Sequence, residues 1–193
     1  MPHINYGEKE LSFKIVYYGP GLSGKTTNLR YIHRMLDDER RGDMIVLDTE
    51  QERTLFFDFF PLELGRVEGY AIRFNMYTVP GQVYYEASRR LILEGADGVV
   101  FVADSQASKL EENVESFCGL RENIAGFGHE WDEFPLVLQY NKRDMEDILP
   151  VGTLEEQFGL NGTPALEAIA VKGTGVMETI RMASRLVIEK FRL

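Results

Sequence analysis

The sequence predicts an α/β domain built on a mostly parallel β-sheet, and three observations point to this fold class. Runs of apolar, β-branched and aromatic residues alternate with segments of helical character, which is the order expected when helices connect parallel strands. The run 98–103 is apolar throughout, as in a central strand covered on both faces. The chain has 193 residues, 44% of them apolar and 27% charged, so we expect one domain spanning residues 1–193.

The first part of the chain contains three predicted strands and one helix. Residues 11–18 are apolar and rich in β-branched and aromatic side chains, so we expect a buried strand. A helix at 24–36 follows and ends near the charged run 37–41. Residues 54–60 and 70–78 have the composition of strands and are joined by a short, glycine-containing connection. These two strands should therefore pair antiparallel, at one edge of the sheet.

The second part of the chain continues the alternation of helices and strands. We expect a helix at 84–93, ended by Gly95, and then the apolar strand 98–103. Apolar residues recur at three- and four-residue steps from Leu110 to Phe127, which predicts an amphipathic helix. The remaining elements are expected to be a strand at 135–140, a short helix at 154–158, a strand at 165–171 and a closing helix at 176–191.

Composition argues against several classes of function. With 21 basic and 31 acidic side chains the net charge is -10, whereas nucleic-acid and anionic-lipid binders need a basic face. The polar N-terminus has no apolar signal core, no stretch reaches the roughly 20 apolar residues of a membrane span, and no lipid-anchor motif is present. We therefore expect a cytoplasmic protein without a lipid anchor. The single cysteine, Cys118, excludes an intrachain disulfide, and its apolar neighbours predict a buried thiol.

A phosphate-binding loop follows the first predicted strand directly. Gly19–Thr26 reads G-x-x-x-x-G-K-T and opens a predicted helix, which is the context that this motif requires. Its glycines allow backbone N–H groups to surround phosphate oxygens, and the helix N-terminus favours an anion there. Lys25 is expected to reach the β- and γ-phosphates, and the Thr26 hydroxyl to ligate Mg²⁺. The predicted phosphate contacts are Gly19, Gly21, Leu22, Ser23, Gly24, Lys25, Thr26 and Thr27.

A second motif predicts which base is bound. Asn141-Lys142-Arg143-Asp144 comes at the end of the strand predicted at 135–140 and resembles the N-K-x-D guanine motif of GTPases. Asp144 would accept hydrogen bonds from guanine N1–H and the 2-amino group, which adenine lacks. Lys142 would lie along the base, and Asn141 would tie this loop to the phosphate loop. The segment 168–172 resembles a weaker guanine loop, with the Ala170 amide facing the guanine oxygen and Val171 beside it.

The segment 78–82, Thr-Val-Pro-Gly-Gln, resembles the D-x-x-G-Q of the second Ras-like switch. Gly81 could donate its N–H to the γ-phosphate, and Gln82 could orient the attacking water. Thr78 stands where that motif has an Mg²⁺-associated Asp. Another carboxylate, such as Asp58 or Asp104, could substitute for it.

Arg53 and Thr54 resemble the first Ras-like switch. Thr54 would be a second Mg²⁺ ligand beside Thr26. Arg53 could be an arginine finger supplied by the same chain, which would stabilise the charge of the transition state. From its chemistry alone, Arg53 could equally be a solvated arginine in a charged segment. Gln82, Arg53 and Lys25 form the predicted catalytic set.

Together these motifs are similar to those of the Ras-like small GTPases. The segments 19–26, 53–59 and 78–82 look specifically like the MglA subfamily, bacterial Ras-like GTPases of gliding motility and cell polarity. The resemblance covers nearly the whole chain. It implies a P-loop NTPase fold, a Ras-like G domain with a six-stranded sheet, one antiparallel edge strand and helices on both faces.

The same resemblance implies a cofactor, partners and a location. GTP would be hydrolysed to GDP with Mg²⁺, under the control of a Roadblock-domain activating protein similar to MglB. The partner would reposition Arg53 and Gln82 rather than donate an arginine of its own. The GTP form would bind effectors. The sequence identifies neither these effectors nor an exchange factor. Without a lipid anchor, protein partners would recruit the chain to a cell pole.

Two other functions share parts of this pattern. Thr78 in place of the acid would suit a scaffold that holds GTP and scarcely hydrolyses it. A small-molecule kinase also uses a phosphate loop, but its arginine-rich lid is missing, since Arg89 and Arg90 lie in a predicted helix.

The Phe residues of 56–60 face both sides of a predicted strand. One side could form an apolar partner surface with Tyr84 and Tyr85, or helices of this chain could cover both sides.

Overall fold

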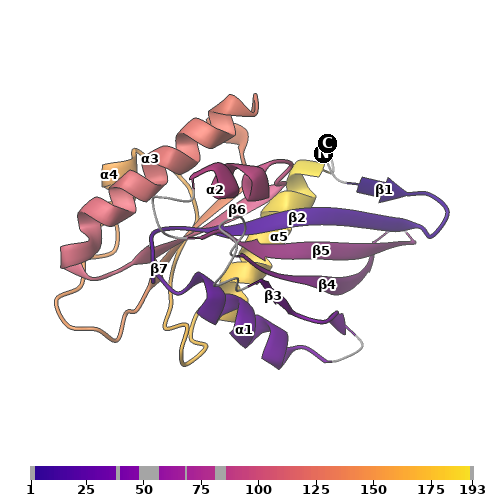
Figure 1. The fold of residues 1–193 in the computed structure, drawn as a ribbon, viewed down its shortest axis with the longest axis horizontal. Coiled ribbons are helices and arrows are strands. Elements are labelled where there is room, and N and C mark those ends of the chain that lie inside the picture. The colour runs from indigo at the N-terminus through magenta and orange to yellow at the C-terminus, as the bar shows by residue number, and fades with distance from the viewer. Residues whose placement is uncertain (1–2, 38–39, 48–56, 68, 81–85, 192–193) are drawn as a thin grey trace.

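The described residues fold around an eight-stranded sheet with helices on both faces (Figure 1). The computed structural model describes residues 3–37, 40–47, 57–67, 69–80 and 86–191. The strands are β1 His3–Asn5, β2 Glu10–Tyr18, β3 Ile45–Leu47, β4 Phe57–Val67, β5 Tyr70–Thr78, β6 Gly98–Asp104, β7 Leu136–Asn141 and β8 Ala165–Glu167. The helices are α1 Lys25–Met35, α2 Glu86–Leu93, α3 Leu110–Gly126, α4 Thr153–Phe158 and α5 Val176–Phe191, with short 3-10 turns η3 Ala107–Lys109 and η4 Trp131–Glu133.

The centre of the sheet is parallel, as predicted. The strand order is β3-β4-β5-β2-β6-β7-β8. The pairings along the row β5-β2-β6-β7-β8 are all parallel. Parallel pairing brings the carboxyl ends of the strands to one edge, where Tyr18, Thr78, Asp104 and Asn141 end β2, β5, β6 and β7. Ligands of such sheets bind at this edge.

Two helical layers cover the two faces of the sheet (Figure 1). Helices α1 and α5 pack on one face, and α2, α3 and α4 on the other. The side chains of β6 alternate between the two layers: Phe101 packs with α3, whereas Val100 and Val102 pack with α1 and α5. Every residue of β6 is buried, as its apolar sequence predicts.

Within the described part of the chain, the sheet has eight strands rather than the six that the family resemblance implies. The added strand β1 folds back on β2 through a turn in which Asn5 Oδ1 accepts from the N–H groups of Gly7 and Glu8, at 3.1 and 3.2 Å. It pairs antiparallel with β2 before the pairing of β2 with β6 begins, so it occupies an otherwise open strand edge. The other added strand, β3, pairs antiparallel with β4.

Three other predictions are corrected in detail. The antiparallel pairing of β4 with β5 is confirmed, but β4 is longer than expected because its pairing continues through a bulge near Gly65. The last predicted strand, 165–171, is only three residues long, since turns follow it: the N–H of Lys172 donates to Ile169 O at 2.9 Å. Cys118 is exposed on α3 rather than buried, because apolar periodicity places its neighbour Phe117, not Cys118, on the inner face.

The aromatic run of β4 is packed within the chain. Phe60 is fully buried, and Phe57 and Phe59 are half-buried against Tyr77, with ring centroids at 6.0 and 4.7 Å. Residue 56 and the pair 84–85 lie outside the described residues. None of the helices that the structure describes is both long and apolar enough to cross a lipid bilayer.

The aromatic cluster under α3 gives a test of the core. Phe117 is 2% exposed and stacks on Phe158 with ring centroids 3.9 Å apart. Replacing Phe117 by alanine should lower the free energy of unfolding by about 3–5 kcal/mol, because the cavity left behind cannot fully collapse. Urea unfolding measures this. Leu91→Ala, at a position 57% exposed on α2, is the control and should change stability by less than about 0.5 kcal/mol.

Candidate functional site

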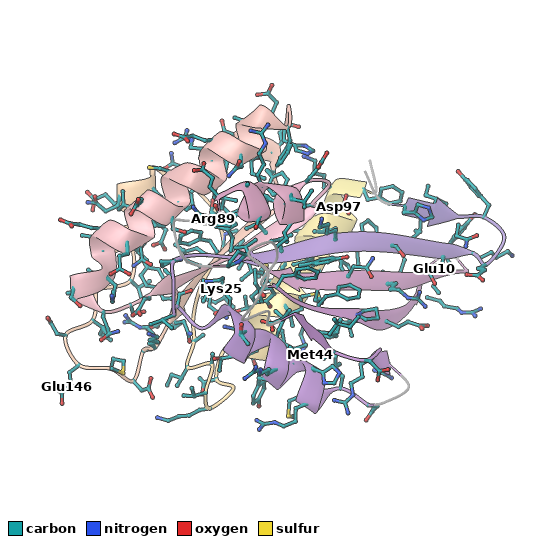
Figure 2. All side chains as sticks on the ribbon, viewed as in Figure 1. Glu10, Lys25, Met44, Arg89, Asp97 and Glu146 are labelled. Carbon is teal, nitrogen blue, oxygen red and sulfur yellow. The ribbon has the colours of Figure 1, made fainter. Side chains whose placement is uncertain are left out.

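The two predicted nucleotide motifs meet at the carboxyl edge of the sheet. The phosphate loop follows β2, and the N-K-x-D segment begins at the last residue of β7, two strands away. The side-chain amide of Asn141 donates to Ser23 O at 2.7 Å, so the expected tie between the two loops is present. Figure 2 shows Lys25 beside the end of β2, near the middle of the molecule.

Two glycines of the phosphate loop stand where no other residue fits. Gly19 has φ +141°, and a Cβ there would lie 2.2 Å from Val102 O on β6. Gly24 has φ +103°, and a Cβ there would lie 2.2 Å from Asn141 Nδ2. Both contacts are shorter than real Cβ atoms allow, and both φ values favour glycine. The motif glycines therefore let the loop pass close to two neighbouring strands.

Lys25 crosses the phosphate loop from the first turn of α1. It is 6% exposed, and its Nζ donates to Gly19 O at 3.0 Å and to Pro20 O at 2.6 Å. The pKa of Lys25 is lowered to about 7, mainly by burial and also by the charge of Arg89, while Asp58 acts in the opposite direction. A bound anion would favour the charged form of this lysine.

The rest of the loop also suits an anion. Ser23 Oγ is buried and has no hydrogen-bond partner among the described residues. Leu22 is 91% exposed and has φ +60°, so its side chain faces solvent rather than the loop. Gly21 and Thr27 are half-buried on either side of these residues.

Arg89 is a second buried cation near this site, and the sequence analysis did not single it out as a site residue. It lies on α2, is 7% exposed, and its guanidinium is 5.8 Å from the ring centroid of Tyr18, the residue before the phosphate loop. Its Nε has no hydrogen-bond partner among the described residues. The next residue, Arg90, is exposed and lies over Phe127. A local positive region thus exists on a chain of net charge -10.

A carboxylate does approach the position of Thr78. The Thr78 hydroxyl donates to Asp58 Oδ2 at 3.0 Å, and the Asp58 N–H donates to Thr78 Oγ1 at 2.8 Å. The same Oδ2 accepts from the Thr26 hydroxyl at 2.5 Å. Asp58 is 4% exposed and comes from β4, the antiparallel neighbour of β5. Of the two substitutes expected for the missing acid, Asp58 is the one beside Thr26.

Asp104, the other expected substitute, lies at the base-reading loop instead. Its Oδ2 accepts from Lys142 Nζ at 2.6 Å, and its Oδ1 accepts from the backbone and side chain of Gln106, both at 3.1 Å. Asn113 of α3 brackets the strand end by bonding the Asp104 N–H and C=O. Asp104 is 1% exposed, so Lys142 is held by a buried carboxylate. Lys142 itself has φ +64°.

The loop between β8 and α5 supplies the third part of the base end. We expected the Ala170 N–H to face the guanine oxygen, but it donates to Asn141 Oδ1 at 2.9 Å. The next amide, that of Val171, has no hydrogen-bond partner among the described residues. Asp144 has a partly exposed side chain, and Lys172 Nζ lies 3.0 Å from its Oδ2. This hydrogen bond with Lys172 lowers the pKa of Asp144.

A buried amide network behind the loops was also missed from the sequence. Asn28 of α1 and Gln139 of β7 exchange two side-chain hydrogen bonds, of 2.9 and 3.0 Å. Gln139 also donates to Thr179 Oγ1 of α5 at 2.9 Å. All three residues are fully buried. The network joins three elements under the site, and no local sequence pattern marks it.

Four predicted site residues, Arg53, Thr54, Gly81 and Gln82, lie outside the described residues. Within the described part of the chain, no group of three or more His, Cys, Asp or Glu side chains could hold a metal ion. A cation beside Thr26 would therefore need further oxygen ligands. The hydroxyl and the nearby carboxylate are hard oxygen donors, which is the chemistry that Mg²⁺ prefers.

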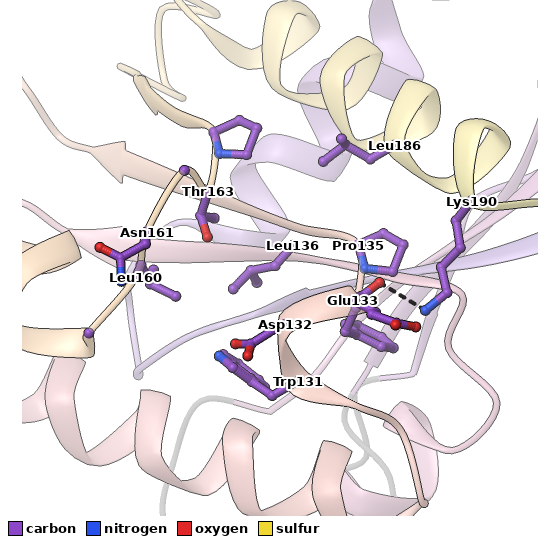
Figure 3. A pocket seen from close by; sticks show the side chains of 14 residues that line it. Trp131, Asp132, Glu133, Pro135, Leu136, Leu160, Asn161, Thr163, Leu186 and Lys190 are labelled. Atoms are coloured by element: carbon purple, nitrogen blue, oxygen red, sulfur yellow. Dashed lines mark hydrogen bonds between the residues drawn. The ribbon is translucent and has the colours of Figure 1, made fainter.

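A separate cavity of about 410 Å³ lies away from these loops (Figure 3). It is lined by residues before β7 and β8, including Trp131 and Thr163, and by the end of α5. Lys190 Nζ donates to Glu133 O at 2.8 Å across its rim. None of the predicted nucleotide contacts lines it.

Comparison with known proteins gives relatives along the whole chain. The chain is 49% identical over 192 residues to the mutual gliding-motility protein MglA of Myxococcus xanthus, covering 100% of this chain and 98% of that protein. It is 27% identical to elongation factor 4 of Desulforudis audaxviator over 95% of this chain and 28% of that protein. It is 26% identical to the GTP-binding nuclear protein GSP1 of Encephalitozoon cuniculi over 72% of this chain and 58% of that protein. No protein-family model matches the chain.

Proposed function

The chain belongs to the MglA family of Ras-like GTPases, and from this premise we propose that it is a GTP-binding switch that hydrolyses GTP to GDP and phosphate. The observation that carries the proposal is the meeting of the phosphate loop and the N-K-x-D loop, joined by the 2.7 Å bond from Asn141 to Ser23. We further propose that the chain acts as one domain in the cytoplasm, in gliding motility and cell polarity. Protein partners recruit it to a pole.

The phosphate end is formed by one loop and one buried lysine. Backbone N–H groups of 19–27 and the N-terminus of α1 receive the phosphates. Lys25 Nζ exchanges its loop carbonyl partners, Gly19 O and Pro20 O, for β- and γ-phosphate oxygens. Ser23 Oγ, buried and without a partner in the described residues, is a further donor within the loop. Nearby, Arg89 adds positive charge, and its Nε has no hydrogen-bond partner among the described residues.

The metal site is formed by hydroxyls with a carboxylate behind them. Thr26 and Thr54 hold Mg²⁺, which neutralises developing charge on the phosphates when bound. Asp58 takes the place of the acid missing at 78, because it accepts hydrogen bonds from both Thr26 and Thr78. Such supporting groups orient the ligands of a metal and raise its affinity.

The base end is formed by three segments. Asp144 accepts from guanine N1–H and the 2-amino group, and Lys142, held by Asp104, lies along the base. Asn141 holds the base loops to the phosphate loop. The Val171 N–H, which has no hydrogen-bond partner within the described part of the chain, faces the guanine oxygen in place of that of Ala170.

Hydrolysis uses residues contributed by this chain. Gln82 orients the attacking water, Gly81 donates its N–H to the γ-phosphate, and Arg53 stabilises transition-state charge. A Roadblock-domain activating protein similar to MglB repositions Arg53 and Gln82. The unaided rate should be about 10⁻² s⁻¹ or slower, since one arginine is supplied in cis.

Single-turnover GTP hydrolysis tests this assignment. Gln82→Leu should abolish most of the stimulation by a Roadblock-domain protein, because leucine cannot orient water. Gln157→Leu, an exposed change on α4, should leave both rates unchanged. Equal rates for wild type and Gln82→Leu, with and without the partner, would remove the proposed mechanism.

A GTP-holding scaffold with negligible hydrolysis is the second candidate, and Thr78 is the observation that favours it. Asp58 weakens this candidate because a carboxylate is present behind the metal position. Multiple-turnover hydrolysis in Mg²⁺ separates the two functions: sustained phosphate release rules out the scaffold.

A further inference from the structure

The carboxylate proposed to read guanine already has a cationic partner from this chain. Lys172 Nζ lies 3.0 Å from Asp144 Oδ2, and the two residues come from different loops, after β8 and after β7. An ammonium is a hydrogen-bond donor with a positive charge. It occupies the same carboxylate that the donors of guanine need, at N1 and at the 2-amino group. The Lys172 ammonium thus takes the place of a guanine donor at the Asp144 carboxylate.

We propose that Lys172 is an internal competitor of guanine: it holds Asp144 when the base is absent and speeds nucleotide release by recapturing this carboxylate. The proposal rests on the function proposed above and adds a residue that sets how long a nucleotide stays bound. It concerns Lys172 alone, because Asp144 already belongs to the proposed base site.

The backbone around Lys172 is held while its side chain is free to move. The N–H groups of Lys172 and Gly173 both donate to Ile169 O, at 2.9 Å. Gly173 packs against the ring of Tyr31 on α1, where an added Cβ would lie 1.9 Å from Tyr31 Cζ. The Lys172 side chain is 62% exposed. The ammonium can therefore leave Asp144 for water when guanine enters and return when guanine leaves, with no change of fold.

The electrostatic cost of displacing Lys172 is small because the pair faces water. Exposed ion pairs of this kind change an equilibrium by about two- to five-fold. The hydrogen bond from Lys172 also lowers the pKa of Asp144, which favours the ionised carboxylate. The carboxylate is then ready to accept guanine as soon as the ammonium moves. The expected effect is thus a modest, measurable change in release rate.

Stopped-flow release of a fluorescent GDP analogue tests the proposal, with wild type, Lys172→Met and Lys172→Arg. Methionine keeps the length of the side chain and removes its charge, so release should slow by about two- to five-fold. Arginine can still bind Asp144, so release should remain as fast as in wild type. Lys109→Met is the matched control, since Lys109 also forms an exposed ion pair, with Glu112 at 2.6 Å on α3, and should not alter release.

Salt gives a second readout that a merely structural role of Lys172 would not change. Raising ionic strength from about 0.05 to 0.5 M screens an exposed pair, so the ratio of the wild-type rate to the Lys172→Met rate should fall toward one. Faster release from Lys172→Met, an unchanged rate, or a ratio independent of salt would each overturn the proposal. If wild type bound GDP no better than ADP, the proposed function itself would fail, which is a different outcome.

Discussion

Replacing Asp144 by asparagine should lower the affinity for GDP by about 10³-fold and create binding of xanthosine diphosphate. Sites built to hydrogen-bond a ligand reject analogues that lack the bonding groups by about 10⁴–10⁵-fold, and the loss here should be smaller because asparagine keeps one acceptor. Asparagine lacks the charge and offers one acceptor oxygen, so it cannot serve both guanine donors. Xanthine has a carbonyl oxygen where guanine has the 2-amino group, and the asparagine NH₂ can donate to it. Titration calorimetry with GDP and XDP measures both affinities.

Glu146→Gln is the matched control for this exchange. Glu146 lies two residues further along the same loop and is exposed, and Figure 2 shows it at the outer end of the loop. The control removes one negative charge at nearly the same place, so it separates hydrogen bonding from general electrostatics. It should bind GDP as wild type does. An Asp144→Asn protein that kept its GDP affinity would show that the base is read elsewhere.

Replacing Asp58 by asparagine should raise the Mg²⁺ concentration needed for tight GTP binding by about 10–100-fold. The carboxylate is buried and accepts hydroxyl hydrogen bonds from Thr26 and Thr78 through one oxygen. An amide can turn its NH₂ toward these hydroxyls, which rotates the Thr26 oxygen away from the metal position. Titrating Mg²⁺ at fixed nucleotide, with fluorescence as the readout, gives the midpoint for each protein.

Asp104→Asn is the comparison that makes this result specific. Asp104 is as buried as Asp58, but its partners are Lys142 and Gln106 at the base loop. The Asp104→Asn substitution should weaken nucleotide binding. It should leave unchanged the Mg²⁺ concentration at the midpoint of the titration of the nucleotide-bound protein. Urea unfolding of both variants corrects for lost stability. If Asp104→Asn moved the midpoint and Asp58→Asn did not, the assignment of Asp58 would be wrong.

Most of the fold could be predicted because its signals are local. The apolar run of β6 and the period of α3 follow from side chains within one segment, and both elements lie where expected. The antiparallel pairing of β4 with β5 follows from a short connection. The strands β1 and β3 were missed because their three residues each have no period of their own and form only where a neighbouring strand edge is open.

The candidate site divides in the same way. The phosphate loop and the N-K-x-D loop could be predicted from contiguous motifs, because each loop is formed by a few consecutive residues. The partners of these motifs come from other strands and loops: Asp58 for Thr26, Asp104 for Lys142, and Lys172 for Asp144. The threonine at position 78 left Asp58 and Asp104 as possible substitutes in the sequence, and only the distances from Thr26 and Thr78 to Asp58 in the structure distinguished them.

The fold class and the two nucleotide motifs thus followed from the order of residues, because these depend on residues that are neighbours along the chain. The contacts between residues that are neighbours only in space were decided by the packing of the sheet and helices. The net charge of -10 illustrates the difference. It is a sum over all residues, whereas the field at the site arises from Lys25 and Arg89, two cations that α1 and α2 bury beside the same loop. Coulomb energy depends on separation and burial, and neither is written in the sequence.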